Sequence, residues 1–146
     1  MSGEGIRTDA APAPVGAYPH ARRAGDLLFL SGVGPRQPGS NVVPGNVHDA
    51  NGQLIDHDIA AQCRQVFANV RAVLEASGAQ WSDLVDVTVF LTDMQRDFAA
   101  YNRIYAEYFA GVDACRTTLG ISALPTPIAI ELKCIAALHP QKNPPA

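Results

Sequence analysis

The chain has 146 residues, of which 47% are apolar, and its formal net charge at neutral pH is −3. This length is typical of a single domain with a substantial hydrophobic core. The acidic balance argues against a basic face that binds nucleic acid, and no apolar run is long enough to span a bilayer.

Both ends of the chain are rich in proline and small residues. The first 13 residues lack a charged segment followed by an apolar stretch, so they do not read as a secretory signal. We expect residues 1–13 to form a flexible lead-in, residues 14–139 a single domain, and residues 140–146 a flexible tail. The three cysteines are far apart in sequence, which favours a reduced, cytoplasmic setting over a disulfide framework.

In the N-terminal half, residues 21–31 predict a hairpin, because Gly25-Asp26 supplies a turn before the short apolar run 27–30. Residues 32–57 are rich in proline and glycine, which is typical of a functional or covering loop. Within that loop, Asn51-Gly52 is suited to close a small hairpin. A helix follows up to about Ser77, because apolar residues recur at intervals of three and four: Ile59, Cys63, Val66, Val70, Val73 and Leu74.

In the C-terminal half, alternating residues over 85–91 predict a strand. A second helix carries an aromatic stripe and ends near Gly111, and strands follow from Thr117 to about Ser122 and over 128–137. This order predicts an α+β fold in which both helices cover one face of a single sheet. The other face would carry Phe90 and Ile135, so we expect it to be buried against other copies of the chain.

Two charged residues stand out near the C-terminus. Arg116 lies where a strand should begin, and arginine presents a planar fork of donors that fits a carboxylate. Glu131 lies within an apolar strand, where a carboxylate costs free energy unless it has a hydrogen-bonding or ionic partner or a catalytic role. Together they suggest a site that holds a carboxylate and moves protons, although a structural ion pair or two unrelated surface groups would give the same pattern.

The sequence carries no recognisable signature of a metal or nucleotide site. The four histidines show no ligand spacing, and the glycines of residues 31–35 match neither a phosphate loop nor a dinucleotide fingerprint. Nothing in the sequence supports a metal site.

Several short segments, in their order and spacing, resemble the Rid/YjgF superfamily of enamine and imine deaminases. The resemblance runs from about Pro14 to His139. The segments that carry it are Gly16-Ala17-Tyr18, Ser31-Gly32, the helix 59–77, residues 87–94, residues 101–109, Arg116-Thr117-Thr118, Leu124-Pro125 and Ile130-Glu131-Leu132.

The resemblance implies a homotrimer with a chorismate-mutase-like fold, sites at the subunit interfaces, and no metal or organic cofactor. Arg116 matches the residue that binds the substrate carboxylate, and Glu131 matches the residue that positions or activates water. The positions that match the surroundings of the pocket are Tyr18, Ser31, Gly32, Asn102 and Thr118.

The chain also departs from the commonest family pattern. It has Tyr18-Pro19-His20, an arginine at position 36 after the Ser-Gly segment, a longer loop before the first helix, and Lys133 where a second acidic residue is usual. These features look more like the 2-aminomuconate deaminase branch, which acts in the breakdown of aromatic compounds. In that case Arg36 would hold the distal carboxylate, and Arg22, Arg23 or His20 are alternative candidates for this position. His20 would also assist catalysis.

Three other functions fit the same residues. A general deaminase of small 2-imino acids would need Arg116 and Glu131 but not Arg36. A ligand-binding or protein-protecting trimer without catalysis would use the same pocket. Ribonuclease activity, also attributed to relatives, is disfavoured by the acidic balance and by the absence of a basic stripe.

Overall fold

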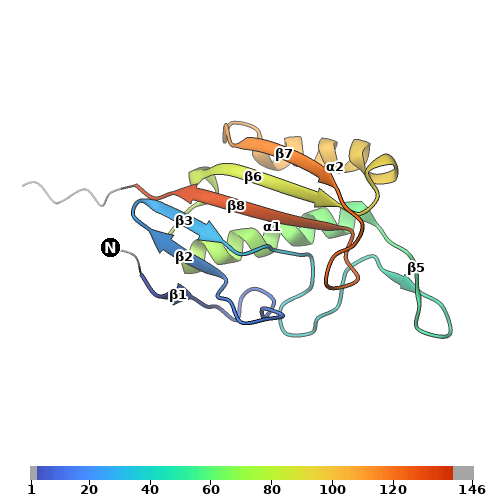
Figure 1. The fold of residues 1–146 in the computed structure, drawn as a ribbon. Helices are drawn as coiled ribbons and strands as arrows, with labels where there is room; N and C mark the ends of the chain where they lie inside the picture. Colours follow the sequence, from blue (N-terminus) through green and yellow to red (C-terminus); the bar gives the residue numbers. More distant parts are fainter. Residues whose placement is uncertain (1–2, 140–146) are drawn as a thin grey trace, which may run out of the picture.

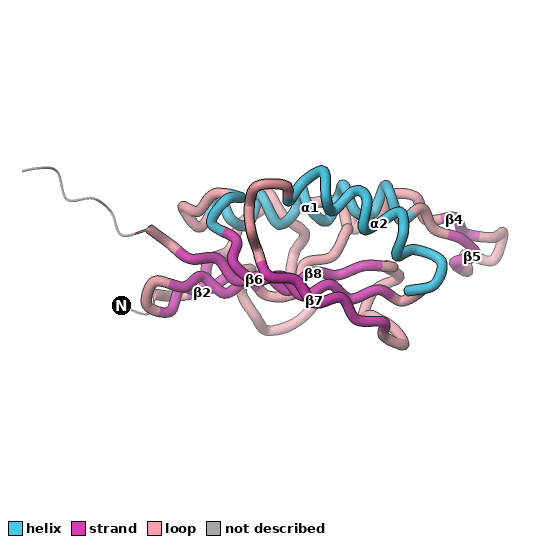
Figure 2. The backbone as a smooth tube through the Cα atoms, turned by 90° about the horizontal axis from the view of Figure 1, so that it is seen from above, coloured by secondary structure: helices cyan, strands magenta, loops and turns pink. Residues whose placement is uncertain are grey.

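A six-stranded mixed sheet with two helices on one face forms the body of the protein in a computed structural model, which describes residues 3–139 (Figures 1 and 2). The helices are α1 (Ile59–Ala76) and α2 (Met94–Phe109), and a 3₁₀ turn, η1, covers Trp81–Asp83. The strands are β1 (Gly5–Ile6), β2 (Ala21–Ala24), β3 (Leu27–Leu30), β4 (Val47–His48), β5 (Leu54–Asp56), β6 (Leu84–Leu91), β7 (Cys115–Gly120) and β8 (Ile130–Ala137).

The strands of the main sheet lie in the order β1-β2-β3-β8-β6-β7. Every neighbouring pair is antiparallel except β6 and β7, which are parallel. The parallel pair follows from α2, since a helical crossover is the usual connection between parallel neighbours. The α+β fold with both helices on one face of the sheet is confirmed.

The core lies between the sheet and the helices. Strand β8 alternates strictly, so that Leu132 and Cys134 are fully buried beneath the helices while Glu131 and Lys133 point to the opposite face. The apolar stripe of α1 meets this buried row, as the periodicity predicts. The carboxylate of Asp58 caps α1 by accepting from the amides of Ala60 and Ala61.

The opposite face of the sheet, which we call the open face, is covered by no helix or strand of residues 3–139. Leu27, Phe29, Val85 and Leu119 are each between 37% and 43% exposed there, beside the partly buried Phe90 and Ile135. The apolar character expected for this face is therefore confirmed. Among residues 3–139 there is also no helix with the length and apolarity that crossing a bilayer requires.

The lead-in differs from the flexible segment we expected. From Gly3 onward it lies against the domain: β1 pairs with β2, and Ala11 is only 3% exposed. The periodicity arguments missed this because the segment has no repeating apolar pattern, and its few contacts come from proline, alanine and one short strand. The tail 140–146 lies outside the described residues.

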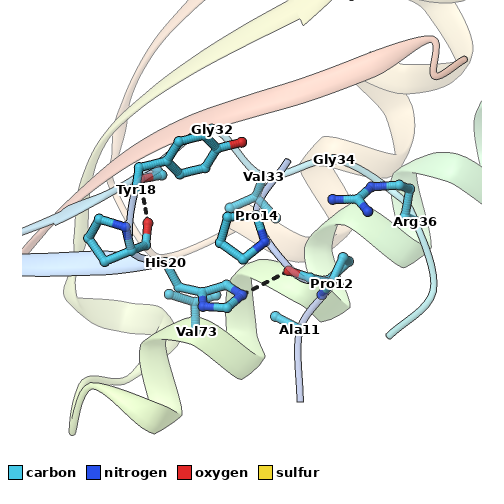
Figure 3. Close-up of a pocket in the computed structure, with 12 residues that line it drawn as sticks. Ala11, Pro12, Pro14, Tyr18, His20, Gly32, Val33, Gly34, Arg36 and Val73 are labelled. Atoms are coloured by element: carbon cyan, nitrogen blue, oxygen red, sulfur yellow. Dashed lines mark hydrogen bonds between the residues drawn. The ribbon is translucent and has the colours of Figure 1, made fainter. Parts of the chain in front are cut away.

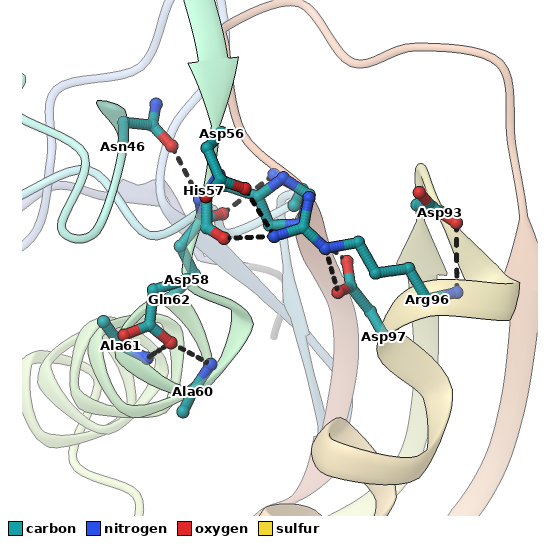
Figure 4. Close-up of polar contacts among 11 residues, drawn as sticks. Asn46, Asp56, His57, Asp58, Ala60, Ala61, Gln62, Asp93, Arg96 and Asp97 are labelled. Carbon is teal, nitrogen blue, oxygen red and sulfur yellow. Dashed lines mark hydrogen bonds and ion pairs between the residues drawn. The ribbon is translucent and has the colours of Figure 1, made fainter. Parts of the chain in front are cut away.

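A small hairpin of β4 and β5 projects from the body, as Asn51-Gly52 suggested (Figure 1). Its base is fastened to the start of α2 by ion pairs (Figure 4). His57 Nε2 lies 2.7 Å from Asp97 Oδ2, and the side chain of Asp97 is only 2% exposed. Arg96 donates to Asp56 Oδ1 at 2.6 Å and to the His57 carbonyl at 2.7 Å.

Replacing Asp97 with alanine should lower the free energy of unfolding by roughly 2–3 kcal/mol, because it leaves the half-buried His57 ring without its partner. Urea unfolding followed by circular dichroism would measure this. Glu75→Ala is a matched control, since it removes an exposed acidic helix residue, and we expect a change within about 0.5 kcal/mol. Equal losses in the two variants would contradict the role assigned to the ion pair.

Candidate active site

The first part of the site, which we call the arginine site, lies on the edge strand β7 and the facing side of α2. Arg116 Nη1 donates to Asn102 Oδ1 at 2.8 Å. The guanidinium carbon lies 4.8 Å from the ring centroid of Tyr105 and 5.5 Å from that of Tyr101. The Tyr101 hydroxyl in turn lies 3.0 Å from Thr118 Oγ1.

This geometry prepares Arg116 to bind an anion. The aromatic rings attract the cation without neutralising it, and Asn102 satisfies only part of its donor fork. The residue remains exposed, so its other N–H groups are open to a ligand. A planar carboxylate fits such donors in two-point contact.

The second part is a cavity around Glu131, which we call the glutamate cavity. It is lined by Val15, Tyr18, Gly32, Gly34, Arg36, Pro125, Thr126, Ile128 and Glu131. Burial raises the pKa of the Glu131 carboxyl above its ordinary value. Gly32 leaves room for this carboxylate, because a Cβ at position 32 would lie 2.9 Å from Glu131 Cδ.

The two parts lie on opposite faces of the sheet. Arg116 is paired with Val87, which is buried beneath the helices, whereas Glu131 is paired with Phe90 on the open face. Phe90 comes three positions after Val87, an odd offset, and successive side chains of a strand alternate between faces. One protomer therefore does not bring Arg116 and Glu131 together.

Arg36 lies in the glutamate cavity, as expected for a second cation near Glu131. Its Nη1 donates to Asn41 Oδ1 and its Nη2 to the Ala13 carbonyl, both at 2.7 Å. These two bonds link the guanidinium to the lead-in and to the loop after β3. The alternative candidates Arg22 and Arg23 lie on β2 and do not line this cavity.

His20 does not occupy the catalytic position we expected. Its Nε2 lies 2.8 Å from the Pro12 carbonyl oxygen (Figure 3). Its Nδ1 accepts from the Thr8 amide at 3.4 Å. Both ring nitrogens thus contact backbone of the lead-in. The ring helps to hold the lead-in in place and does not line the glutamate cavity.

The remaining expected pocket residues divide between the two parts, with Tyr18 and Gly32 lining the glutamate cavity. Ser31 Oγ donates to the Pro19 carbonyl at 2.7 Å, which shapes the turn that carries Tyr18. The Tyr18 hydroxyl accepts from the Val15 amide at 3.2 Å and the residue is 39% exposed. Asn102 and Thr118, by contrast, belong to the arginine site.

Sequence reasoning missed two contributions to these parts. Tyr101 and Tyr105 looked like ordinary core residues of α2, yet both rings lie under Arg116. Lys133 lies on the open face two residues beyond Glu131 and donates to the Leu30 carbonyl, and burial lowers the pKa of its amine. Within residues 3–139, no group of three or more His, Cys, Asp or Glu side chains could hold a metal ion.

The family model described as Endoribonuclease L-PSP matches residues 8–138. The chain belongs to the Rid/YjgF (L-PSP) family. A RutC family protein of Pyrococcus horikoshii is 40% identical over 133 residues, covering 91% of this chain and 96% of the relative. Reactive Intermediate Deaminase A, chloroplastic, of Arabidopsis thaliana is 37% identical over 135 residues, covering 92% of this chain and 66% of the relative.

Solved structures of this family have the same fold. The YjgF gene product of E. coli superposes with a TM-score of 0.77 at 33% identity, over 92% of this chain and 98% of that one. E. coli TdcF with bound serine gives a TM-score of 0.79 at 28% identity, over 94% of this chain and all of that one (100%). The family thus includes a protein named as a reactive intermediate deaminase and a member that holds an amino acid.

Replacing Glu131 with glutamine should change stability in a pH-dependent way. Because burial raises the pKa of Glu131, the native state binds the proton more tightly than the unfolded chain. The contribution of the protonated Glu131 carboxyl to folding stability is fully present below its ordinary pKa of 4.5. It is lost as the pH rises through the pKa of the folded state. At each pH we compare the free energy of unfolding of Glu131→Gln with that of the parent. We expect this difference to be more favourable to the variant at pH 7 than at pH 4.

Urea unfolding of both proteins at the two pH values tests this, with the exposed Glu75→Gln as control. A Glu131→Gln difference that stays the same between the two pH values would show that burial does not perturb this carboxyl.

Proposed function

We propose that this protein is an enamine and imine deaminase whose active site is completed by two protomers of a homotrimer. The observation that carries the proposal is the division of the site: Arg116 lies on one face of the sheet and Glu131 on the other. Each half has one of the two functions that the reaction needs, which are binding a carboxylate and handling a proton. The name of the Arabidopsis relative supports the same chemistry, and the E. coli relative TdcF is shown with bound serine, a small carboxylate.

Association of copies is favoured by the apolar open face. Residues such as Phe29 and Leu119 would be removed from water when that face packs on another protomer. Arg116, on the exposed edge strand β7, would then meet the glutamate cavity of the neighbour. Sites between subunits are common because clefts form where subunits meet.

The mechanism assigns one role to each half. The enamine first takes a proton on carbon and becomes an iminium. Water adds to the iminium carbon while the Glu131 carboxylate accepts a proton from that water, and the carbinolamine then loses ammonia to leave the 2-oxo product. A carboxyl whose pKa is raised toward neutrality is a better proton acceptor, and such help is worth roughly 10²–10⁴ in rate. Arg116 fixes the substrate carboxylate throughout.

The substrate we favour is 2-aminomuconate, an extended dicarboxylate enamine from aromatic-compound catabolism. Arg116 would bind the carboxylate beside the amino-bearing carbon. Arg36 lies in the glutamate cavity and would bind the distal carboxylate. The guanidinium is held by Asn41 and Ala13, so it is oriented before a ligand arrives.

A general deaminase of small 2-imino acids is the second candidate. The observation in its favour is that both terminal nitrogens of Arg36 already have protein partners, so its role can be to close the cavity. Endoribonuclease activity, which the name of the family model suggests, is disfavoured by the net charge of −3.

Ammonia release from enzymatically generated 2-aminomuconate and from 2-iminopropanoate separates these candidates. We expect Arg116→Ala to lower kcat/KM on both substrates by roughly 100-fold, because both contain the carboxylate that it binds. Arg36→Ala should lower kcat/KM by about 10-fold on the dicarboxylate alone. Full activity in Arg116→Ala would refute the mechanism, equal turnover of both substrates would favour the general deaminase, and no turnover of either would favour a binding role.

The division of the site between protomers can be tested by subunit mixing. Arg116→Ala and Glu131→Gln homotrimers should each be nearly inactive. After the two are unfolded together and refolded in equal amounts, random assembly gives about one quarter of the interfaces an intact Arg116 and an intact Glu131. We expect a corresponding return of ammonia release. Refolding each variant alone is the control, and no recovery in the mixture would mean that a single protomer supplies both residues.

A further inference from the structure

Helix α1 carries two carboxamide side chains that are almost completely buried, Gln62 at 0% and Asn69 at 1% exposure. They are seven residues apart, so they lie two turns apart on one side of the helix. A buried amide must find hydrogen-bond partners, because leaving it unpaired costs about 1–3 kcal/mol. Neither residue is explained by the apolar packing of α1, and both bond to loops that border the glutamate cavity.

Gln62 bonds to the loop before β8. Its Oε1 accepts from the Ala129 amide at 2.8 Å, and its Nε2 donates to Asn46 Oδ1 at 2.9 Å. Asn46 then donates to the Pro127 carbonyl at 2.7 Å. This side of the cavity, formed by residues 125–128, is thus attached to α1.

Asn69 bonds to the opposite side. Its Nδ2 donates to the carbonyls of Gly34 and Arg36, both at 2.8 Å. Its Oδ1 accepts from Gln65 Nε2 at 3.0 Å, which fixes the orientation of the amide. Asn69 therefore holds the backbone on both sides of Pro35, in the segment that runs over α1 in Figure 3.

The hydrogen bonds of Asn69 affect the position of the Arg36 side chain. Its guanidinium position depends on the direction in which the backbone at residue 36 projects it, and Asn69 bonds to the carbonyl of that same residue. If this bond were lost, the bonds of the guanidinium to Asn41 and Ala13 would remain, but the backbone from which the side chain extends would be free to shift and to carry the charge away from its present position. Small displacements of a charged hydrogen-bond donor weaken binding strongly.

We propose that Asn69 is a positioning residue that sets the reach of Arg36 into the glutamate cavity and thereby determines specificity for a dicarboxylate over a monocarboxylate substrate. This inference rests on the proposed function, since it concerns the same site. Asn69 touches no substrate; it acts through the backbone of the Gly34–Arg36 segment.

The test compares Asn69→Leu, which keeps the approximate volume but removes both donors, with Arg36→Ala and with the double variant. For 2-aminomuconate we expect Asn69→Leu to raise KM by about 10-fold, with kcat and the KM for 2-iminopropanoate within about 2-fold of the parent. The double variant should be no worse than Arg36→Ala alone, because residues that act as one unit are not additive. Equal effects on both substrates, or additive losses, would overturn the proposal.

Two further variants separate positioning from general damage. Val70→Ala removes packing from the neighbouring, fully buried position of α1 without touching the loop, and it should leave the substrate preference unchanged. Asn69→Ser keeps one hydroxyl donor in case the leucine variant does not fold, and it should shift the preference in the same direction. A shift in Val70→Ala as large as that in the Asn69 variants would overturn the proposal.

Calorimetric binding of muconate, a stable dicarboxylate without the amino group, gives a readout that does not need turnover. We expect the parent to bind muconate more tightly than hexanoate, and Asn69→Leu and Arg36→Ala to lose this preference. If the parent releases no ammonia but this pattern holds, the proposed function fails and the positioning role stands. If the parent shows no preference for muconate, or both variants keep it, the positioning role is refuted.

Discussion

The alternation of side chains along β8 is the constraint on which the rest of the molecule depends. Leu132 and Cys134 point to the helices and complete the core, so Glu131 and Lys133 must point to the open face. A carboxylate and an amine thereby lie on a surface that also carries Phe29 and Ile135. Folding thus places ionisable groups in an apolar environment on the side where no helix can cover them, and burial shifts the pKa of both.

The two parts of the candidate site differ in their electrostatics: one contains an exposed guanidinium and the other a partly buried carboxyl. Arg116 is kept charged and accessible, because aromatic rings lie under it and Asn102 aligns it. The pKa of Glu131 is raised because burial partly removes the carboxyl from water. Desolvation favours the neutral acid, whereas the exposed guanidinium needs only orientation. Such a contrast between a fixed anion binder and a group ready to exchange a proton is common where small carboxylate substrates react.

Much of the fold could be predicted from the sequence, because its regular elements have strong periodicity. The stripe from Ile59 to Leu74 and the alternation around Val87 and Val89 identify α1 and β6, and Asn51-Gly52 identifies the small hairpin. Arg116 and Glu131 could be selected as site residues from their chemistry. Their placement on opposite faces could not, since it depends on a strand register that only the folded sheet fixes.

The errors concern groups whose partners are irregular backbone. His20 looked like an acid–base residue, but its ring nitrogens bond to Thr8 and Pro12 in a segment that has no periodic signal. No sequence pattern singled out Asn69, which bonds to two carbonyls of a distant loop. A sequence lists the donors and acceptors, but it does not show which backbone groups the turns bring within their reach.

The lead-in connects the edge of the sheet to Arg36, which lines the glutamate cavity. Strand β1 extends the sheet beside β2, His20 holds the segment at Pro12, and the carbonyl of Ala13 accepts from Arg36. Truncation of the chain beyond Ala13 would remove this acceptor and leave the guanidinium bonded to Asn41 alone. Trimming this end would therefore alter the cavity through Arg36, although no residue of the lead-in lines it.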